Sequence, residues 1–208
     1  MAGLRERKAA RTREAISRVA IGLFCARGFD AVTMSEIAEA AEVGRATLFA
    51  YFPAKEALVL DRAQDDDPGR VFSERPPGVS LTEALRRHYR ELAAHFGPAE
   101  VEGTKRIMSL IASTPALMTG LHRMLDRQRT GLAALLAADD SSDASGLTAQ
   151  VVAAQTIGVI LAVKSRFYER LVAGEPALVA ARCLADEADA AFGLLETGIG
   201  SGYRKEAV

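Results

Sequence analysis

The sequence contains few cysteines and no long apolar run. Cys25 and Cys183 are the two cysteines among 208 residues, and their wide separation suits neither a metal site nor a disulfide framework. This scarcity favours a reducing compartment. The charged start of the chain has no apolar signal-peptide core close behind it, and the longest apolar run, residues 151–163, is too short to cross a bilayer. We therefore expect a cytoplasmic protein that has no association with a membrane.

Motifs of catalysis and of cofactor binding are also missing. The sequence has no nucleophile elbow, no glycine-rich phosphate loop and no paired carboxylates in a setting suited to acid–base chemistry. No segment alternates between apolar and polar residues for long enough to predict a strand. We therefore predict an all-α protein that is not an enzyme and that needs no metal or other cofactor.

Basic residues crowd the start of a chain that is nearly neutral as a whole. The formal net charge is −1, yet Arg5, Arg7, Lys8, Arg11 and Arg13 face a single acid within the first thirteen residues. Such a segment either binds phosphates or remains a solvated tail, and charge alone does not decide between these alternatives. The length and the 49% hydrophobic content allow one domain, or a small domain followed by a larger one.

Helical periodicity covers nearly all of the chain. Gly28 is expected to end the first helix, and Thr33 with Glu36 forms the pattern of a capping box at the start of the second. Ser80 and Glu83 repeat that pattern further along. The expected helices cover 11–27, 33–40, 45–52, a short segment from about 55, 80–96, 99–113, 115–138, 147–173 and 176–197. The predicted organisation is a basic arm at 1–10, a small unit at 11–65, a linker at 66–79, a larger unit at 80–198 and a flexible tail at 199–208.

The helix predicted over 45–52 has a narrow face of small residues. On a helical wheel Leu48 and Phe52 fall together and can join a small core, whereas the opposite side is centred on Ala46, Thr47 and Ala50. Small central residues let a helix backbone approach the bases in the DNA major groove, where alanine methyls can meet thymine methyls. The face therefore suits a DNA-recognition helix.

Aromatic and basic residues border this face. Phe49 and Tyr51 flank it, and Tyr51 can offer its hydroxyl group to a phosphate. Arg45 is long enough for a bidentate contact with guanine. Lys55 is expected to begin the next helix, where its ammonium and the free backbone N–H groups form an anion site. Half-buried packing of the two aromatic residues is the alternative.

The segment from Leu23 to Leu58 carries the ordered pattern "LF..RGFD..T...IAEAA.V...TLF.YF..KE.L". It resembles the DNA-binding domain of the TetR family of bacterial transcription regulators over residues 11–61, and the basic arm resembles that of actinobacterial members. The resemblance implies a homodimer with an N-terminal helix-turn-helix and an all-helical C-terminal domain. That domain would bind a small-molecule effector and pair through its last two helices.

The family's DNA contacts can be transferred position by position. The resemblance places the recognition helix at Arg45–Tyr51, with glycine at position 44 instead of the usual Ser or Thr cap. Phe49 stands where many members have tyrosine, and Ala50 stands where a longer polar residue is common. The predicted DNA-binding residues are Arg11, Thr33, Arg45, Ala46, Thr47, Phe49, Tyr51 and Lys55.

The helix predicted over 147–173 is apolar on almost all sides, which is typical of a fully buried helix. Ala154, Gly158 and Ala162 recur every four residues and would let another helix come close. With Leu184 and Phe192 of the last helix they predict one half of a four-helix dimer interface. Packing within a single chain is the alternative.

An effector pocket is expected in the larger unit. The candidate ligand-binding residues are His88, His95, Met108, Met118, His122, Met124 and Phe167. Methionine suits adaptable apolar sites, but core packing is the alternative for each of these residues. His88, Glu91 and His95 also lie at a helical spacing that could hold a metal, although no Cys/His motif supports such a site.

These patterns predict a ligand-responsive repressor that binds a palindromic operator in double-stranded DNA as a homodimer and is released by a small-molecule effector. Two other classes stay open. One is a helical small-molecule-binding protein or enzyme with a vestigial DNA-binding end, and the other is a nonspecific architectural DNA binder.

Overall fold

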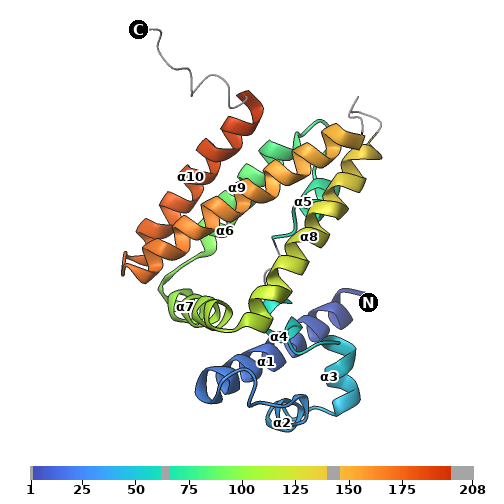
Figure 1. The fold of residues 1–208 in the computed structure, drawn as a ribbon, viewed down its shortest axis with the longest axis vertical. Helices are drawn as coiled ribbons and strands as arrows, with labels where there is room; N and C mark the ends of the chain where they lie inside the picture. The colour runs from blue at the N-terminus through green and yellow to red at the C-terminus, as the bar shows by residue number, and fades with distance from the viewer. Residues whose placement is uncertain (1, 62–65, 140–145, 198–208) are drawn as a thin grey trace. The chain divides into compact units, whose positions relative to one another are not determined.

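The structure is a computed structural model that describes residues 2–61, 66–139 and 146–197 (Figure 1). Every regular element in these ranges is a helix, which confirms the all-α prediction. The chain divides into two compact units: residues 1–65 together with 106–122, and residues 66–105 together with 123–208. The predicted tail at 199–208 lies outside the described residues.

The first helix, α1 (Ala2–Arg27), begins well before the predicted start at residue 11. The predicted basic arm therefore continues α1 over residues 2–10, because Ala, Leu, Arg, Lys and Glu dominate this segment and all favour a helix. Arg7, Lys8 and Arg11 are exposed on it. Gly28 ends the helix as predicted, with a left-handed φ of 87° and its N–H bonded to the carbonyl of Phe24 at 2.8 Å.

Three short helices complete the N-terminal part of the first unit: α2 (Met34–Ala40), α3 (Arg45–Tyr51) and α4 (Ala57–Leu60). The predicted capping box is present, since Thr33 N–H donates to Glu36 Oε2 at 2.8 Å and Glu36 N–H donates to Thr33 Oγ1 at 3.2 Å. Between α2 and α3, Glu42 has a left-handed φ of 53°, which makes the turn tight. The core of this part includes Ile16, Ala20, Phe24, Val32, Ile37, Leu48, Phe52 and Leu58.

Parts of two later helices, α7 (Pro98–Ser113) and α8 (Pro115–Ala137), also belong to the first unit. Leu110, Ile111 and Leu117 are buried, and a Cβ placed on Gly120 would lie 2.9 Å from Leu60 Cδ1. The prediction of one continuous unit over 80–198 therefore differs from this division. Helical periodicity runs unbroken along each helix and carries no mark of where its tertiary partners change.

The predicted linker at 66–79 contains a helix, α5 (Pro68–Glu74). Asp67 caps it by accepting a hydrogen bond from Gly69 N–H at 2.9 Å, and Pro68 occupies its first turn. Phe72 is buried in a small cluster with Leu132 and Ala153. Seven residues are too few for a helical period to stand out from a segment rich in Asp, Pro and Gly.

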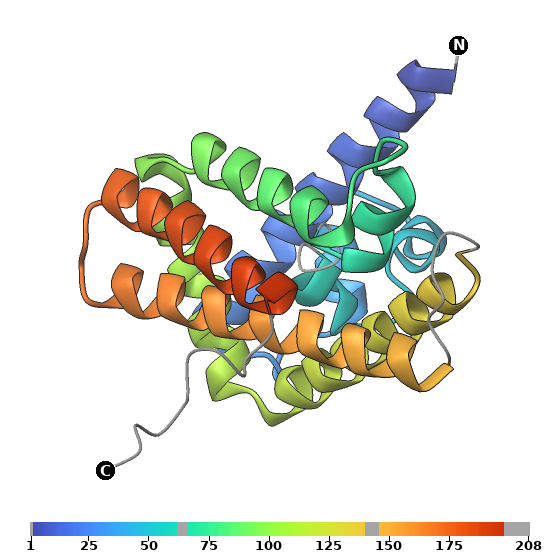
Figure 2. The same cartoon turned by 90° about the horizontal axis from the view of Figure 1, so that it is seen from above.

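The second unit is built on three helices, α6 (Leu81–His95), α9 (Gly146–Val172) and α10 (Ala177–Thr197), which lie side by side in Figures 1 and 2. Their shared core comprises Leu85, Tyr89, Ala93, Ile160, Val163, Phe167, Leu171, Ala180, Ala181, Leu184, Ala188 and Phe192. Ser80 caps α6 as predicted, but the carboxylate of Glu83 pairs with Arg87 at 2.9 Å, and no return bond to Ser80 completes a capping box among the described residues.

Candidate nucleic-acid interface and effector domain

The helix α3 is held by a single buried side chain. Leu48 is fully buried, while Ala46, Thr47 and Ala50 are exposed, as the helical wheel predicts. Arg45 is also exposed, although the wheel places it near the side of Leu48 and Phe52. Phe49 is 43% exposed. Because α3 uses only one residue of its seven for packing, the rest of its surface is available to a partner.

The start of α3 leaves its first N–H groups without a side-chain cap. Gly44 occupies the N-cap position in an extended conformation (φ −66°, ψ 146°) and has no side chain to accept a bond. The end of the helix is fixed by Phe52, which is fully buried and donates its N–H to the carbonyl of Leu48 at 2.8 Å. The recognition helix is therefore anchored at its C-terminal end and open at its N-terminal end.

Thr33 is occupied by the capping box. Its hydroxyl donates to Glu36 Oε2 at 2.8 Å while it accepts from Glu36 N–H, and Arg27 Nη2 lies 2.7 Å from Glu36 Oε1. The backbone bond from Thr33, helped by the bond from Arg27, lowers the pKa of Glu36 to about 2. A phosphate contact from Thr33 stays a prediction, and it would compete with this ionised carboxylate.

Lys55 differs from its predicted setting. The helix α4 begins at Ala57, and the N–H groups of Ala57 and Leu58 already bond to the carbonyls of Ala54 (3.1 Å) and Lys55 (3.2 Å), so these groups are not free to bind an anion. The Lys55 ammonium lies 4.4 Å from the centre of the Phe29 ring. This cation–π contact orients the lysine, and its charge is what remains for a phosphate.

The other predicted phosphate-binding residues differ in how exposed they are. Tyr51 is half-buried at the end of α3, and Arg11 is exposed on α1. Arg13, which belongs to the same basic run, is part of the fold: it pairs with Asp61, and its guanidinium lies 4.9 Å from the centre of the Phe52 ring. One member of the basic run therefore stabilises the core beneath α3.

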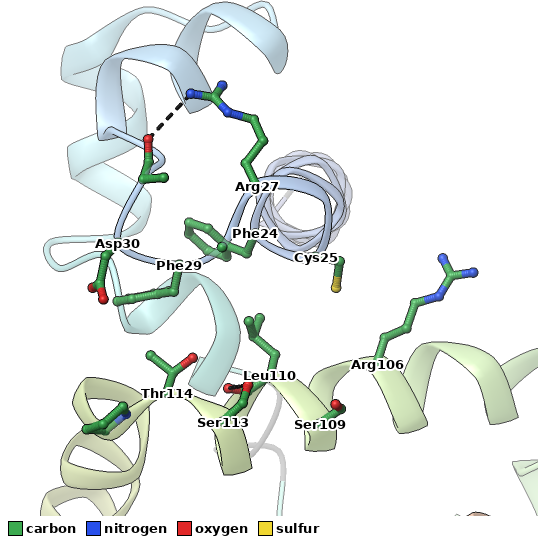
Figure 3. Close-up of a pocket in the computed structure, with 13 residues that line it drawn as sticks. Phe24, Cys25, Arg27, Phe29, Asp30, Arg106, Ser109, Leu110, Ser113 and Thr114 are labelled. Atoms are coloured by element: carbon green, nitrogen blue, oxygen red, sulfur yellow. Dashed lines mark hydrogen bonds between the residues drawn. The ribbon is translucent and has the colours of Figure 1, made fainter.

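A groove of about 620 Å³ opens beside this region of the first unit (Figure 3). The end of α1 with the α1–α2 loop forms one wall, and α7 forms the other, from which Leu110 points toward α1. Arg27 Nη2 donates to the carbonyl of Ala31 at 3.4 Å across one end. None of the predicted DNA-binding or ligand-binding residues lines this groove.

The seven candidate ligand residues do not form one group. His88 and Phe167 adjoin the core of the second unit, where Met124 is also buried. His95 is exposed, and its Nδ1 donates to the carbonyl of Glu91 at 2.7 Å. Three others, Met108, Met118 and His122, belong to the first unit. Within the described residues, no group of three or more His, Cys, Asp or Glu side chains could hold a metal ion.

His88 belongs to a polar cluster that was not predicted from the sequence. Asp66 accepts a hydrogen bond from His88 Nε2 at 3.0 Å and another from Lys164 Nζ. Tyr89 lies edge-on to the His88 ring, with ring centres 5.5 Å apart. On a helical wheel Lys164 falls on the same side of α9 as the buried Ile157 and Leu171. A lysine on the buried side of a helix indicates a buried partner and could have been found in the sequence. Asp66 lies in a segment without periodicity and offers no such indication.

Burial and ion pairing shift the pKa values of Asp66 and Lys164 in opposite directions. Burial alone would raise the pKa of Asp66, but hydrogen bonds and charge from His88 and Lys164 hold it at about 2. Burial would lower the pKa of Lys164, yet the neighbouring tyrosines and Asp66 raise it above its ordinary value. Burial raises the pKa of Tyr89, so this phenol stays neutral. At neutral pH the cluster thus contains one carboxylate and one ammonium.

The predicted interface residues divide into two groups. Leu184 and Phe192 are buried in the core of the second unit, so the prediction that they face a partner subunit is wrong. An apolar pattern does not tell an internal core from an interface. Ala154, Gly158 and Ala162 lie on the exposed side of α9, beside Val151 and Leu161, which are 46% and 40% exposed.

A capped helix, a tight turn and an exposed second helix held by one buried residue define a helix-turn-helix DNA-binding protein. Residues 16–61 match the bacterial regulatory proteins of the TetR family, and residues 79–199 match the MftR C-terminal domain. The chain therefore belongs to the TetR family of bacterial regulatory proteins, as the resemblance predicted, and is a DNA-binding transcriptional regulator.

Individual relatives support this placement. The chain is 32% identical over 148 residues to the HTH-type transcriptional regulator TcmR of Streptomyces glaucescens, a match that covers 68% of this chain and 66% of that protein. It is 29% identical over 165 residues to the putative mycofactocin biosynthesis transcriptional regulator MftR of Mycobacterium tuberculosis, covering 74% and 79%. A putative TetR-family regulator from Mesorhizobium loti shares the fold, with a TM-score of 0.53, 20% identity and coverage of 91% and 96%.

Proposed function

We propose that this chain is a homodimeric repressor that binds a palindromic operator through α3 of each protomer and releases it when a small-molecule effector binds the second unit. The observation that carries the proposal is the exposed face of α3, where Leu48 alone is buried. Such a protein works in the cytoplasm, where bacterial DNA lies, and needs no catalytic group.

The exposed residues of α3 would divide the work of recognition. Arg45 and Thr47 carry the polar groups that can read base edges, and Ala46 and Ala50 can meet thymine methyls. The exposed ring of Phe49 would pack against a groove wall. Phosphate contacts would come from Tyr51, Lys55, Arg11 and, in competition with Glu36, Thr33. These contacts fix the register of the protein on the duplex but carry no sequence information.

Dimerisation is proposed through the outward side of α9. This side is lined by Leu147, Val151, Ala154, Gly158, Leu161 and Ala162. Leu147 is 71% exposed, and apart from the neighbouring residues of α9 itself no described heavy atom lies within 4 Å of a Cβ placed on Gly158, so a second helix has room to approach. A two-fold axis would set this surface against its own copy.

The same helix is long and apolar enough to cross a membrane by length and composition alone. A core helix passes the same test, and the opposite side of α9 packs on α6 and α10 through Ile160, Val163 and Phe167. We therefore assign its exposed apolar side to a partner subunit.

The deciding experiment is selection of bound DNA from a random duplex pool, followed by footprinting. We expect an inverted repeat whose half-sites lie about one helical turn apart, roughly 34–36 Å, or a multiple of that distance. Recovery of duplexes without any shared repeat would instead favour an architectural DNA binder. Repeating the selection with candidate effectors tests release, and compounds that bind while DNA affinity stays unchanged would favour a sequestering protein.

A further inference from the structure

Tyr89 has a buried hydroxyl group without a hydrogen-bond partner. The residue is 1% exposed, and its Oη contacts no acceptor or donor among the described residues. Its ring packs between His88, at 5.5 Å, and Phe192, at 5.9 Å, so the side chain is fixed by its neighbours. Leaving a buried hydroxyl unpaired is costly, and such groups in native proteins normally have a partner.

The neighbouring groups do not supply that partner. Each oxygen of Asp66 accepts one hydrogen bond, one from His88 Nε2 and the other from Lys164 Nζ, and neither accepts from Tyr89 among the described residues. The Lys164 ammonium has three N–H donors, and Asp66 accepts from it among the described residues. Among the described residues, the Tyr89 hydroxyl and two of the three Lys164 N–H groups therefore make no hydrogen bond.

The unused donors of the cluster, rather than its net charge, suit a carboxylate as the acceptor, because hydrogen bonds to a charged acceptor are stronger than neutral ones. The carboxylate of Asp66 is already compensated by Lys164, and the charges of both groups act on the Tyr89 hydroxyl. An added anion beside Tyr89 would be attracted by Lys164 and repelled by Asp66, so its binding would depend on the hydrogen bonds that it accepts from Tyr89 and from the remaining N–H groups of Lys164.

We propose that Tyr89 and Lys164 form the polar anchor for a carboxylate group of the effector, which is an apolar acid. The Tyr89 hydroxyl donates to the carboxylate, and the ammonium of Lys164 lies against it. Phe96 and Phe167, whose ring centres are 4.9 Å apart in the same core, provide aromatic surface for the apolar part of the acid. This inference rests on the proposed function, because it concerns the effector of a regulator.

The cluster lies at the edge of the core and not at its centre. The side chains of His88 and Lys164 are 22% and 18% exposed, whereas Tyr89 is 1% exposed, so an acid would have to pass these two side chains to reach the Tyr89 hydroxyl. The competing explanation is an ordered water molecule, which satisfies many buried polar groups in proteins. A water would satisfy Tyr89 without any preference for acids, and this difference makes the two explanations separable.

The test is isothermal titration of the full chain with octanoate and benzoate, and with octanamide and benzamide as uncharged counterparts. We expect the acids to bind more tightly than the amides. Tyr89→Phe should weaken acid binding by about tenfold or more, because a hydrogen bond to a charged group is lost. Tyr203→Phe, which removes a phenol hydroxyl outside the described residues, is the matched control and should leave acid binding unchanged.

A second variant guards against misfolding. Lys164→Met combined with Asp66→Asn removes the buried pair without leaving a lone charge, and should abolish the preference for acids while the circular dichroism spectrum stays helical. The assignment is overturned if no acid binds the unaltered chain, if acids and amides bind alike, or if Tyr89→Phe keeps the full affinity. The last result is the one that a water molecule at Tyr89 predicts.

Failure of this assignment and failure of the proposed function are distinguishable. Each variant is also tested without any acid for binding to the selected operator. Operator binding without Tyr89-dependent acid binding leaves the regulator proposal standing and removes the anchor. Acid binding that depends on Tyr89, in a chain with no DNA preference, supports the anchor and removes the regulator proposal.

Discussion

Replacing Gly158 with leucine tests the proposed dimer without disturbing the protomer. A Cβ at this position would meet nothing within 4 Å, so the new side chain has room on the exposed side of α9. Leucine also favours a helix more than glycine does, by somewhat less than about 1 kcal/mol. Gly158→Leu should therefore leave the free protomer helical and at least as stable as before.

In a dimer closed through this surface, the same leucine would overfill the contact between the two α9 helices. Overpacking costs about 1–3 kcal/mol at one site, and a two-fold interface contains the site twice. The expected loss is about 2–6 kcal/mol, which corresponds to a dissociation constant raised roughly 30-fold to more than 10,000-fold. The weakened dimer should also bind the operator less tightly, since both half-sites must be occupied together.

Analytical ultracentrifugation over a range of concentrations measures the change. Gly131→Leu is the matched control, because Gly131 is an exposed glycine of α8 that also has open space around its Cβ position. The control should sediment like the unaltered chain. If Gly158→Leu remains fully dimeric at the lowest concentrations, the subunits pair through another surface and the assignment of α9 fails.

Four further predictions concern the first unit. Arg45→Ala should weaken operator binding by about 1–3 kcal/mol and relax the base preference at one position per half-site, whereas Lys55→Ala should weaken binding to all duplexes alike. Fluorescence anisotropy on single-base operator variants separates these two effects. A uniform loss of affinity with Arg45→Ala would show that Arg45 contacts a phosphate. Deleting residues 1–10 should flatten the salt dependence of binding by about 0.9 in log–log slope per lost phosphate contact, and an unchanged slope would make this end of α1 a solvated helix. Gly28→Ala should lower the free energy of unfolding in urea by about 1–2 kcal/mol, because φ is 87° there, and a neutral result would show that the turn readjusts. The folded-state pKa of Glu36 is lowered from 4.5 to about 2, so its stabilising effect is complete above pH 4.5 and is lost as the pH falls toward 2. Glu36→Gln should remove that part of the pH dependence of stability in thermal melts. An acid profile identical to that of the unaltered chain would contradict the role of the Glu36 carboxylate in the capping box.

The helix-turn-helix could be predicted because its determinants are local. The capping box of Thr33 and Glu36, the stop at Gly28 and the paired burial of Leu48 and Phe52 all depend on residues close together in sequence. Each of these features has its own local signature in the sequence, so the prediction and the structure agree at these residues.

Features that depend on distant partners were harder to predict. Leu184 and Phe192 read as interface residues because apolar periodicity shows that a side is buried but not by what. The division of α7 and α8 between the two units leaves no trace in their helical periods. Asp66 stood in an apparent linker, and only its partners on α6 and α9 give it a structural role.

The small number of buried residues in α3 has an evolutionary consequence. Because Leu48 and the C-cap residue Phe52 fix the helix, substitutions at the exposed Ala46, Thr47 or Ala50 remove no buried side chain from the fold. If these exposed residues contact the operator as proposed, gene duplicates could acquire new operators through single substitutions that leave the buried core unchanged.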